Sequence, residues 1–329
     1  MQTALITGSN GFIGSHLAKF LLEKGFKVRC MVRRTSNLKW LRSLTIEYAY
    51  ADLSDVPALE KAVDGVDYIF HLGGRTKSIT REAYFEANEQ GTQNLVHAAK
   101  EINPKLKRFV YVSSQAAAGP SQGLNPRKES DVPAPVTWYG ESKLAGEKVV
   151  MDDADCIPVV VIRPPSVYGP RDTDVFEIFK AVKWHIKPAL GWQKRYASFI
   201  YVDDLVQGIY LAAVSDHSTG KIFFLISDPV VSWQDMNDRI AEAMQIKAVT
   251  VHLPIFIFTL LALVRDMLAR ITGKASILNL QKINELKQPY WICDGSKARN
   301  MLGFQPEYPL EKGVQNTLKW YVDHGWLKS

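Results

Sequence analysis

Cysteine is scarce in this chain of 329 residues, where only Cys30, Cys156 and Cys293 occur. They lie far apart, none has the spacing of a metal-ligand pair, and an odd number leaves one cysteine outside any disulfide scheme. A disulfide-rich secreted fold and a cysteine-based zinc site are therefore disfavoured. We expect a reducing, cytoplasmic setting and predict no metal site.

Long apolar runs and targeting signals are also missing. Residues 1–8 (MQTALITG) lack the charged region and cleavage site of a signal peptide, and they predict a strand that enters a turn. The apolar run 253–264 (LPIFIFTLLALV) has 12 residues and is followed by Arg265 and Asp266, whereas a spanning helix needs roughly 20 apolar residues. We predict a buried or partly buried helix here, and a contact between this helix and a membrane surface stays open.

A dominant charge of one sign is the third missing feature. The chain has 40 Lys and Arg residues against 34 Asp and Glu residues, which gives a formal net charge of +6. The basic residues are scattered rather than grouped with aromatic residues. This pattern does not favour nucleic-acid binding, and the composition is that of an ordinary globular protein.

The first half of the chain shows a regular alternation of short apolar strands with helical patterns. Such alternation implies right-handed βαβ crossovers and a parallel sheet with helices on both faces. The sequence therefore predicts an α/β fold with a doubly wound parallel sheet of the Rossmann type. The expected strands are 3–7, 27–32, 46–50, 68–72, 109–113 and 159–162, and the expected helices are 12–23, 56–63, 87–101 and 139–150.

The alternation ends after Arg163-Pro164-Pro165, where aromatic and turn-forming residues become frequent. We predict a dinucleotide-binding domain over residues 1–165. A smaller C-terminal substrate lobe is expected to consist mostly of 166–198 and 227–329. Residues 199–226 are expected to return to the first domain.

The segment from Thr7 to Gly14 (TGSNGFIG) joins the first expected strand to the first expected helix. Glycines there let the backbone turn tightly and approach a pyrophosphate, whose charge faces the helix N-terminus. The spacing is GxxGxxG, and its strand-turn-helix context makes it informative. We predict dinucleotide binding by Gly8, Asn10, Gly11, Phe12, Ile13 and Gly14.

The residues after the second strand bear on which dinucleotide is bound. A carboxylate about 20 residues past the glycines would accept a hydrogen bond from a ribose hydroxyl, but this chain has Arg33 and Arg34 there, with Lys39 nearby. Guanidinium groups grip a 2′-phosphate instead. NADP(H) is therefore favoured, and NAD(H) stays open. Asp52, which precedes Leu53, either accepts from the adenine amine or begins the next turn.

Tyr139 and Lys143 lie four residues apart and so share one face of the expected helix. A phenol with a pKa near 10 is a poor base at neutral pH, so an adjacent ammonium and an oxidised nicotinamide are needed to lower that pKa. Ser113 and Ser114 end a preceding strand, where a hydroxyl can hold the substrate oxygen. The pattern predicts proton transfer by Tyr139 with the help of Lys143.

Together these motifs resemble the extended short-chain dehydrogenase/reductases of the NAD-dependent epimerase/dehydratase superfamily. The resemblance runs nearly from end to end, through 7–14 (TGSNGFIG), 71–74 (HLGG), 88–92 (NEQGT), 111–114 (YVSS), 139–143 (YGESK), 163–170 (RPPSVYGP) and 201–205 (YVDDL). It implies that Ser114 is the catalytic serine, because Ser114 lies five positions before Gly119 as the family's serine or threonine does. It also gives Tyr139 and Lys143 the family's acid/base and ribose-binding roles.

The resemblance implies further cofactor-binding residues at the ends of the central strands. These are Leu72, Gly73, Gly74, Asn88, Ser113, Pro164, Ser166 and Val167. Asn88 would also brace the active-site helix, unless it merely starts its own helix. The segment from Pro164 to Val167 would border the nicotinamide, and the two glycines stand where the family more often has alanine.

Both ends of the chain are most similar to the 3β-hydroxysteroid-dehydrogenase-like and dihydroflavonol-reductase-like branch. Arg33 and the C-terminal segment 289–304 carry this similarity, whereas sugar-nucleotide enzymes more often have an acidic residue at the first of these positions. Gln115 and Ala116 stand where dehydratases usually have an Asp-Glu pair. A nucleotide-sugar epimerase or dehydratase with tightly bound NAD stays open as the alternative.

The predicted substrate lobe is rich in apolar and aromatic residues, namely the run 253–264 with Phe256 and Phe258, and Trp184 and Trp192. They favour a hydrophobic small-molecule substrate, a sterol-, lipid- or flavonoid-like alcohol or ketone. The basic residues Arg75, Lys77, Lys194 and Arg195 either clamp a carboxylate or diphosphate or face solvent. Family members often dimerise through the helix that carries the tyrosine and lysine, so a homodimer stays open.

Overall fold

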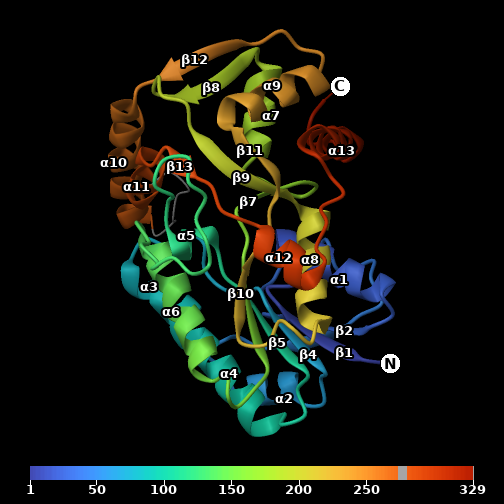
Figure 1. Ribbon diagram of the computed structural model, residues 1–329. Helices are drawn as coiled ribbons and strands as arrows, with labels where there is room; N and C mark the ends of the chain where they lie inside the picture. Colours follow the sequence, from blue (N-terminus) through green and yellow to red (C-terminus); the bar gives the residue numbers. More distant parts are fainter. Residues whose placement is uncertain (273–279, 329) are drawn as a thin grey trace.

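The computed structural model describes residues 1–272 and 280–328, and within them seven strands form one parallel sheet in the order β10-β6-β5-β4-β1-β2-β3 (Figure 1). The strands are β1 (Thr3–Thr7), β2 (Lys27–Val32), β3 (Glu47–Tyr50), β4 (Tyr68–His71), β5 (Arg108–Val112), β6 (Val159–Arg163) and β10 (Lys221–Phe224). The strand order reverses between β1 and β4, and ligands of such sheets bind beyond the carboxyl ends of the strands at that point. The predicted doubly wound α/β fold is confirmed.

Helices cover both faces of this sheet, as an all-parallel sheet requires. On β1, Ala4 and Ile6 point into one core and Leu5 points into the other. The first core is closed by α1 (Phe12–Glu23), α8 (Val202–Val214) and α12 (Ser296–Leu302), and the second by α2 (Val56–Val63), α4 (Gly91–Ile102) and α6 (Trp138–Asp152). Because successive strand residues point to opposite faces, the continuous apolar strands are buried on both sides.

The helix expected over 87–101 is more complex than its pattern indicates. Helix α3 (Arg81–Phe85) runs into a π-helical turn, η1 (Glu86–Gln90), and then into α4. Such turns insert an extra residue into a helix and often lie at functional sites. The turn carries Asn88, one of the predicted site residues.

The upper part of the molecule in Figure 1 is built on a second, smaller sheet and a separate strand pair. The sheet contains β7 (Ser166–Tyr168), β9 (Tyr196–Tyr201), β11 (Ser227–Ser232) and β13 (Tyr290–Trp291), and the pair is β8 (Ile186–Leu190) with β12 (Val249–Leu253). Helices α7 (Phe176–Lys183), α9 (Trp233–Ala243) and α13 (Leu310–Asp323) contribute to their core, and α5 (Gln115–Ala118), α10 (Ile255–Thr272) and α11 (Leu280–Lys287) complete the chain.

The chain returns from this upper part to the main sheet at two places. One is the segment with α8 and β10, and the other is α12, whose Ala298 and Leu302 are buried in the first core. Since α12 falls inside 227–329, that range is not uniformly part of the upper unit. The predicted division into two domains stays a prediction, and residues 273–279 and 329 lie outside the described chain.

The apolar run 253–264 is not buried in a core. Leu253 ends β12, and the rest of the run belongs to α10. Ala262 is fully buried, whereas Phe256 is 69% exposed and Leu260 is 61% exposed. The run is therefore a surface helix with an apolar outer face, and the alternative of a fully buried helix is wrong. In the part of the chain that the structure describes, no helix is both long and apolar enough to cross a membrane.

The expected aromatic wall of the substrate lobe is not formed as a single cluster. Trp184 precedes β8 and Trp192 follows its other end, and both side chains are largely exposed. Trp192 stacks on His252, which lies just before α10. Strand β8 thus separates the two tryptophans, which sequence proximity had grouped together.

Candidate active site

The glycine turn between β1 and α1 has no room for side chains at two of its positions. Gly8 has a φ of +67°, and a Cβ there would lie 2.8 Å from the backbone nitrogen of Gly73. A Cβ on Gly14 would lie 2.2 Å from the carbonyl oxygen of Gly8. The turn therefore brings the ends of β1 and β4 together at the N-terminus of α1, which is the cradle that a dinucleotide pyrophosphate requires.

The basic residues beyond β2 lie at the surface on one side of this turn. Arg33 and Arg34 are exposed, and the Arg34 guanidinium lies 5.4 Å from the ring centre of Tyr50. The Lys39 ammonium lies 4.2 Å from the ring centre of Trp40. These cations are accessible to a ligand that extends past β2.

Asp52 begins the turn that leads into α2. Its Oδ1 atom accepts hydrogen bonds from both the backbone nitrogen and the hydroxyl of Ser54. Leu53 packs against the second core. Asp52 is thus a turn residue in this structure, and its predicted contact with the adenine amine stays a prediction.

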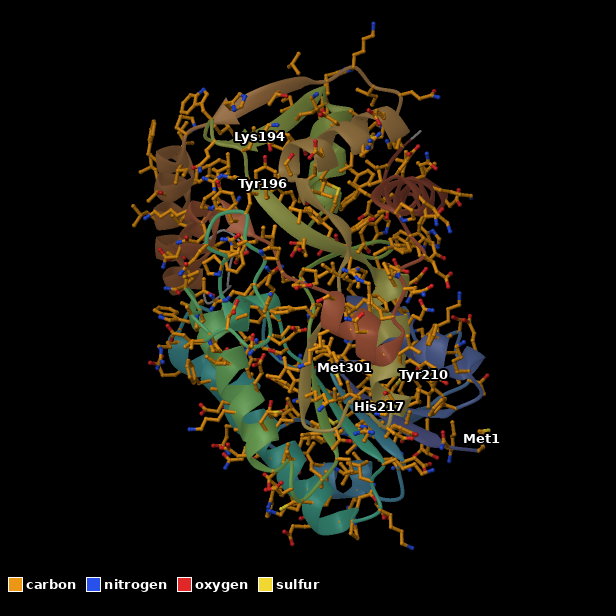
Figure 2. All side chains as sticks on the ribbon, viewed as in Figure 1. Met1, Lys194, Tyr196, Tyr210, His217 and Met301 are labelled. Carbon is orange, nitrogen blue, oxygen red and sulfur yellow. The ribbon has the colours of Figure 1, made fainter. Side chains whose placement is uncertain are left out.

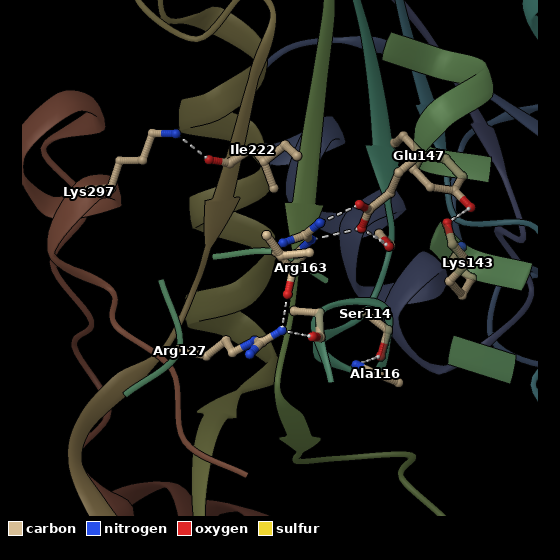
Figure 3. Close-up of polar contacts among 12 residues, drawn as sticks. Ser114, Ala116, Arg127, Lys143, Glu147, Arg163, Ile222 and Lys297 are labelled. Carbon is tan, nitrogen blue, oxygen red and sulfur yellow. Dashed lines mark hydrogen bonds and ion pairs between the residues drawn. The ribbon is translucent and has the colours of Figure 1, made fainter. Parts of the chain in front are cut away.

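Ser114 and Lys143 lie near the end of β5 (Figure 3), and Tyr139 reaches the same place through its hydrogen bond with Ser114. Ser114 caps α5, its Oγ atom accepting from the backbone nitrogen of Ala116 at 3.1 Å, and it also hydrogen-bonds the Tyr139 side chain. The N-terminus of α6 is fixed by Thr137, whose hydroxyl accepts from the backbone nitrogen three residues later. One turn along α6, the Lys143 ammonium donates to the Val112 carbonyl oxygen at 2.9 Å.

Burial controls the protonation of these groups. It raises the pKa of Tyr139 to about 12, although the hydrogen bond with Ser114 lowers that pKa. It lowers the pKa of Lys143 to about 7, against the opposing effect of the Glu147 carboxylate. In the protein alone, desolvation of the phenolate outweighs the favourable hydrogen bond with Ser114. At neutral pH, Tyr139 holds its proton and Lys143 titrates.

A family model described as NAD dependent epimerase/dehydratase family matches residues 4–225. This span contains the glycine turn, Ser114, Tyr139 and Lys143. The chain belongs to the NAD-dependent epimerase/dehydratase family. The resemblance predicted from the sequence motifs is confirmed.

The proteins similar to this chain are named for different reactions, which include reduction, dehydrogenation and epimerisation. The ceramide reductase of Caulobacter vibrioides (strain NA1000 / CB15N) is 29% identical over 98% of this chain and 95% of its own length. The 3 beta-hydroxysteroid dehydrogenase/Delta 5→4-isomerase of Mycobacterium tuberculosis (strain ATCC 25618 / H37Rv) is 28% identical, covering 97% and 90%. The solved UDP-glucuronic acid 4-epimerase from Bacillus cereus, in complex with NAD, matches with a TM-score of 0.79 at 22% identity, covering 98% and 99%, a likeness of fold. The chain is an NAD(P)-dependent enzyme of the extended short-chain dehydrogenase/reductase type.

Asn88 is buried and hydrogen-bonded to other parts of the protein. It is 1% exposed, its Oδ1 atom accepts from the backbone nitrogen of Arg75, and its Nδ2 atom donates to the Ser142 hydroxyl on α6 at 2.9 Å. The predicted cofactor contact of this side chain stays a prediction. Its contact with the active-site helix agrees with the bracing role that the resemblance implies.

His71 links this brace to the glycine turn, and no role was predicted for it. Its Nδ1 atom is 2.6 Å from the Thr7 hydroxyl, and its Nε2 atom is 3.0 Å from the Thr92 hydroxyl. Thr92 in turn donates to the Asn88 carbonyl oxygen. Burial and the nearby Lys143 charge lower the pKa of His71 to about 3, so the ring is neutral. In the sequence, the position of His71 as a polar residue at the end of an otherwise apolar strand could have indicated such a role.

Ser113 is also buried and hydrogen-bonded within the protein. Its hydroxyl donates to the carboxylate of Glu147, which pairs with the buried guanidinium of Arg163 at 2.9 and 2.6 Å (Figure 3). The predicted cofactor contact of Ser113 stays a prediction, and its hydroxyl already has a partner within the protein. Sequence reasoning missed the Glu147–Arg163 pair, although an arginine at the end of an all-apolar strand was a usable signal.

The segment that follows β6 lies beside the Ser114 turn. The Pro164 carbonyl oxygen accepts from the backbone nitrogen of Gln115 at 2.8 Å. Ser166 and Val167 continue as β7 and are partly exposed. Their position, next to the proton-transfer group, fits the expected border of the nicotinamide.

Helix α11 closes the other side of the proton-transfer group, which no sequence pattern indicated. Its Gln281 side chain accepts from the backbone nitrogen of Trp138 at 3.0 Å. The negative charge of Glu285 is among the influences that raise the Tyr139 pKa. Helix α11 is therefore part of the wall around Tyr139.

Two of the basic residues considered as anion clamps have partners within the protein. Arg195 is buried and donates to the carbonyl oxygens of Leu190, Leu286 and Gln288, so it fixes the end of α11. The clamp interpretation is wrong for Arg195. Lys77 forms an exposed ion pair with Asp174 at 3.5 Å.

Proposed function

We propose that this chain is an NADP(H)-dependent oxidoreductase that transfers a hydride between nicotinamide and a hydroxy or keto carbon of a hydrophobic small molecule. The observation that supports it best is the meeting of Ser114, Tyr139 and Lys143 at the end of β5. Because Tyr139 holds its proton at neutral pH, it is suited to act as an acid toward a carbonyl oxygen.

In the reductive direction, the substrate oxygen accepts hydrogen bonds from the Ser114 and Tyr139 hydroxyls, which orient and polarise the carbonyl group. A reduced nicotinamide dinucleotide, held by the glycine turn, would supply the hydride that the carbonyl carbon takes up. As the C=O double bond becomes a C–O single bond, the Tyr139 hydroxyl gives its proton to the oxygen and becomes a phenolate. The Lys143 ammonium stabilises that phenolate by its charge. Oxidation of an alcohol reverses these steps.

The proposed cofactor site follows from the glycine turn and the basic residues beyond β2. The turn and the residues 72–74 would hold the pyrophosphate, and Lys143 would contact the nicotinamide ribose. Arg33 and Arg34 replace the acidic residue that accepts from a ribose hydroxyl. Their exposed guanidinium groups are suited to bind the 2′-phosphate of NADP(H).

A hydrophobic substrate is supported by two of the similar proteins. One relative is named for a ceramide and another for a hydroxysteroid, and both compounds are largely apolar. Arg195, one of the four basic residues considered for binding an acidic substrate group, is buried and occupied by backbone carbonyls. We therefore favour an apolar alcohol or ketone over a nucleotide sugar.

A substrate panel tests this function. Purified protein with NADPH should reduce steroid or long-chain ketones, with one NADPH consumed for each alcohol formed. Tyr139→Phe serves as the inactive control. Isomerisation of a UDP-sugar without net consumption of dinucleotide, together with no turnover of any ketone, would overturn the proposal in favour of an epimerase.

A further inference from the structure

The outer face of α10 is an apolar stripe. Phe256, Leu260, Leu263 and Val264 recur at the spacing of one helical face, and they are 69%, 61%, 44% and 48% exposed. Ala262 is fully buried on the opposite side. A surface helix normally turns its polar side outward, so this arrangement indicates that something other than water meets the stripe.

The surroundings of the stripe are those of an apolar–water boundary. Trp192 is 73% exposed and stacks on His252, which lies three residues before α10 begins. Lys194 is exposed at the same end of the molecule as β8 and β12 (Figure 2). Tryptophan and lysine are typical of the zone where lipid headgroups meet acyl chains.

The sequence that contains α10 and its neighbours has an excess of positively charged residues. Between Lys247 and Lys287 the sequence has six Lys or Arg residues and two Asp or Glu residues, a net charge of +4 out of +6 for the whole chain. Most of the excess positive charge is thus concentrated in this short part of the sequence. Anionic lipid headgroups complement such a segment.

The stripe is also adjacent to the proposed active site. Helix α10 packs against α11, and α11 contacts α6 through the Gln281–Trp138 hydrogen bond. One side of this helix pair therefore meets the tyrosine region, while the other side carries the stripe. No described helix is long and apolar enough to span a bilayer, so any lipid contact is at the surface.

We infer that the α10 stripe docks on the surface of an anionic lipid bilayer and thereby presents the active-site entrance to hydrophobic substrate in the membrane. The part that concerns substrate entry rests on the proposed function, whereas the docking itself does not.

Vesicle flotation tests the docking. The probe is a vesicle of equal parts phosphatidylcholine and phosphatidylglycerol, compared with pure phosphatidylcholine. Wild-type protein should float with the anionic vesicles, more weakly with the neutral ones, and less at high salt. Leu260→Glu/Leu263→Glu should lower partitioning by roughly 30-fold, because two apolar side chains leave the interface.

Ile102→Glu/Val214→Glu is the matched control. Both residues are 39% exposed, and they lie on α4 and α8 in the lower part of the molecule (Figure 1). This variant should float like the wild type. If the α10 double variant does not fold, judged by circular dichroism, Leu260→Ser/Leu263→Ser replaces it.

The catalytic readout separates docking from function. The α10 variant should reduce a water-soluble ketone at the wild-type rate and a vesicle-embedded ketone at least about tenfold more slowly. Wild-type protein that never floats, or equal loss in the α10 and control variants, would overturn the docking. So would a wild-type dimer that the α10 variant converts to monomer, since the stripe would then be a subunit interface. Protein that floats yet reduces no ketone would leave the docking intact and overturn the proposed function.

Discussion

Two buried cations lie on either side of Glu147, and their surroundings differ. The Arg163 guanidinium pairs with both carboxylate oxygens of Glu147, which also accepts from Ser113. Lys143 lies one turn before Glu147 on α6, but its ammonium contacts a backbone carbonyl and the ring face of Tyr111. Among the residues that the structure describes, no carboxylate lies within ion-pair distance of the Lys143 ammonium.

Helix α6 thus interacts with two buried cations in different ways. It binds Arg163 of β6 through Glu147, and it carries Lys143 itself. A buried charge with a matched partner stays charged and fixed in place. A buried charge without one has a shifted pKa and can change its protonation state near neutral pH. Arg163 is the first kind and joins α6 to β6, whereas Lys143 is the second kind and lies beside the tyrosine.

The largest effect is expected at Tyr139, which lies beside Lys143, the unpaired member of this comparison. Tyr139→Phe removes the proton donor and should lower kcat by about 10³-fold or more, with little change in the free energy of unfolding. Tyr84→Phe is the control, since the Tyr84 ring centre lies 6.3 Å from that of Tyr139. Steady-state kinetics with NADPH measure both, and a Tyr139→Phe variant with more than a tenth of wild-type kcat would contradict the mechanism.

The second largest effect is expected for the buried pair of Glu147 and Arg163. Glu147→Gln leaves the Arg163 charge buried without its partner and should lower the free energy of unfolding by about 3–5 kcal/mol, measured by urea denaturation. Glu141→Gln, on the same helix, breaks only the exposed ion pair with Arg81 and should cost less than about 1 kcal/mol. Glu147→Gln/Arg163→Met should recover part of the loss, and a double variant worse than the single one would speak against pairing as the cause.

Lys143→Met should raise the free energy of unfolding, whereas Glu147→Gln lowers it, and the size of the gain should depend on pH. Burial lowers the Lys143 pKa from 10.5 to about 7, so the unfolded chain binds the proton more tightly than the folded one. The resulting destabilisation is complete below about pH 7 and disappears as the pH rises toward 10.5. Lys143→Met should therefore raise the free energy of unfolding by about 1–3 kcal/mol at pH 6 and by less at pH 9.

Lys148→Met controls for the loss of a lysine from α6, because the Lys148 side chain is exposed. It should give no such pH-dependent gain over the same interval. If the free energy of unfolding changed with pH in the same way in both variants, the lowered pKa of the buried Lys143 ammonium would be refuted.

The smallest effect extends the comparison to an exposed cation. Arg33→Asp should weaken NADPH binding by about 10- to 30-fold and NADH binding much less, because a carboxylate repels the 2′-phosphate. Arg42→Asp is the control in the same connection between β2 and β3. Fluorescence titration measures both dissociation constants, and equal losses for the two dinucleotides would refute the role of Arg33.

The fold and the positions of the proton-transfer residues were predictable because they depend on local patterns. The strand-turn-helix at Thr7 to Gly14 and the four-residue spacing of Tyr139 and Lys143 are fixed by nearby sequence. The predicted strands and helices of the first half match the observed ones to within two residues, except for the helix expected over 87–101, which is observed as α3, η1 and α4.

The directions of Ser113 and Asn88 were not predictable in the same way. Strand β5 is buried on both faces, so no apolar–polar alternation shows which way Ser113 points. The π-helical turn changes the phase of the helix that carries Asn88. The contact between Gln281 and Trp138 joins residues 143 positions apart and follows from tertiary packing. The run 253–264 has the same composition whether it faces a core or a membrane.

The repeated passage of the chain between the two sheets has a consequence for how the molecule unfolds. The path leaves the main sheet after β6, returns with α8, leaves again after β10 and returns with α12. No single cut can therefore release either unit as a continuous fragment. We expect the two units to melt in one cooperative transition, and a truncation before β11 to remove α12 from the main core and so to lower the yield of folded protein.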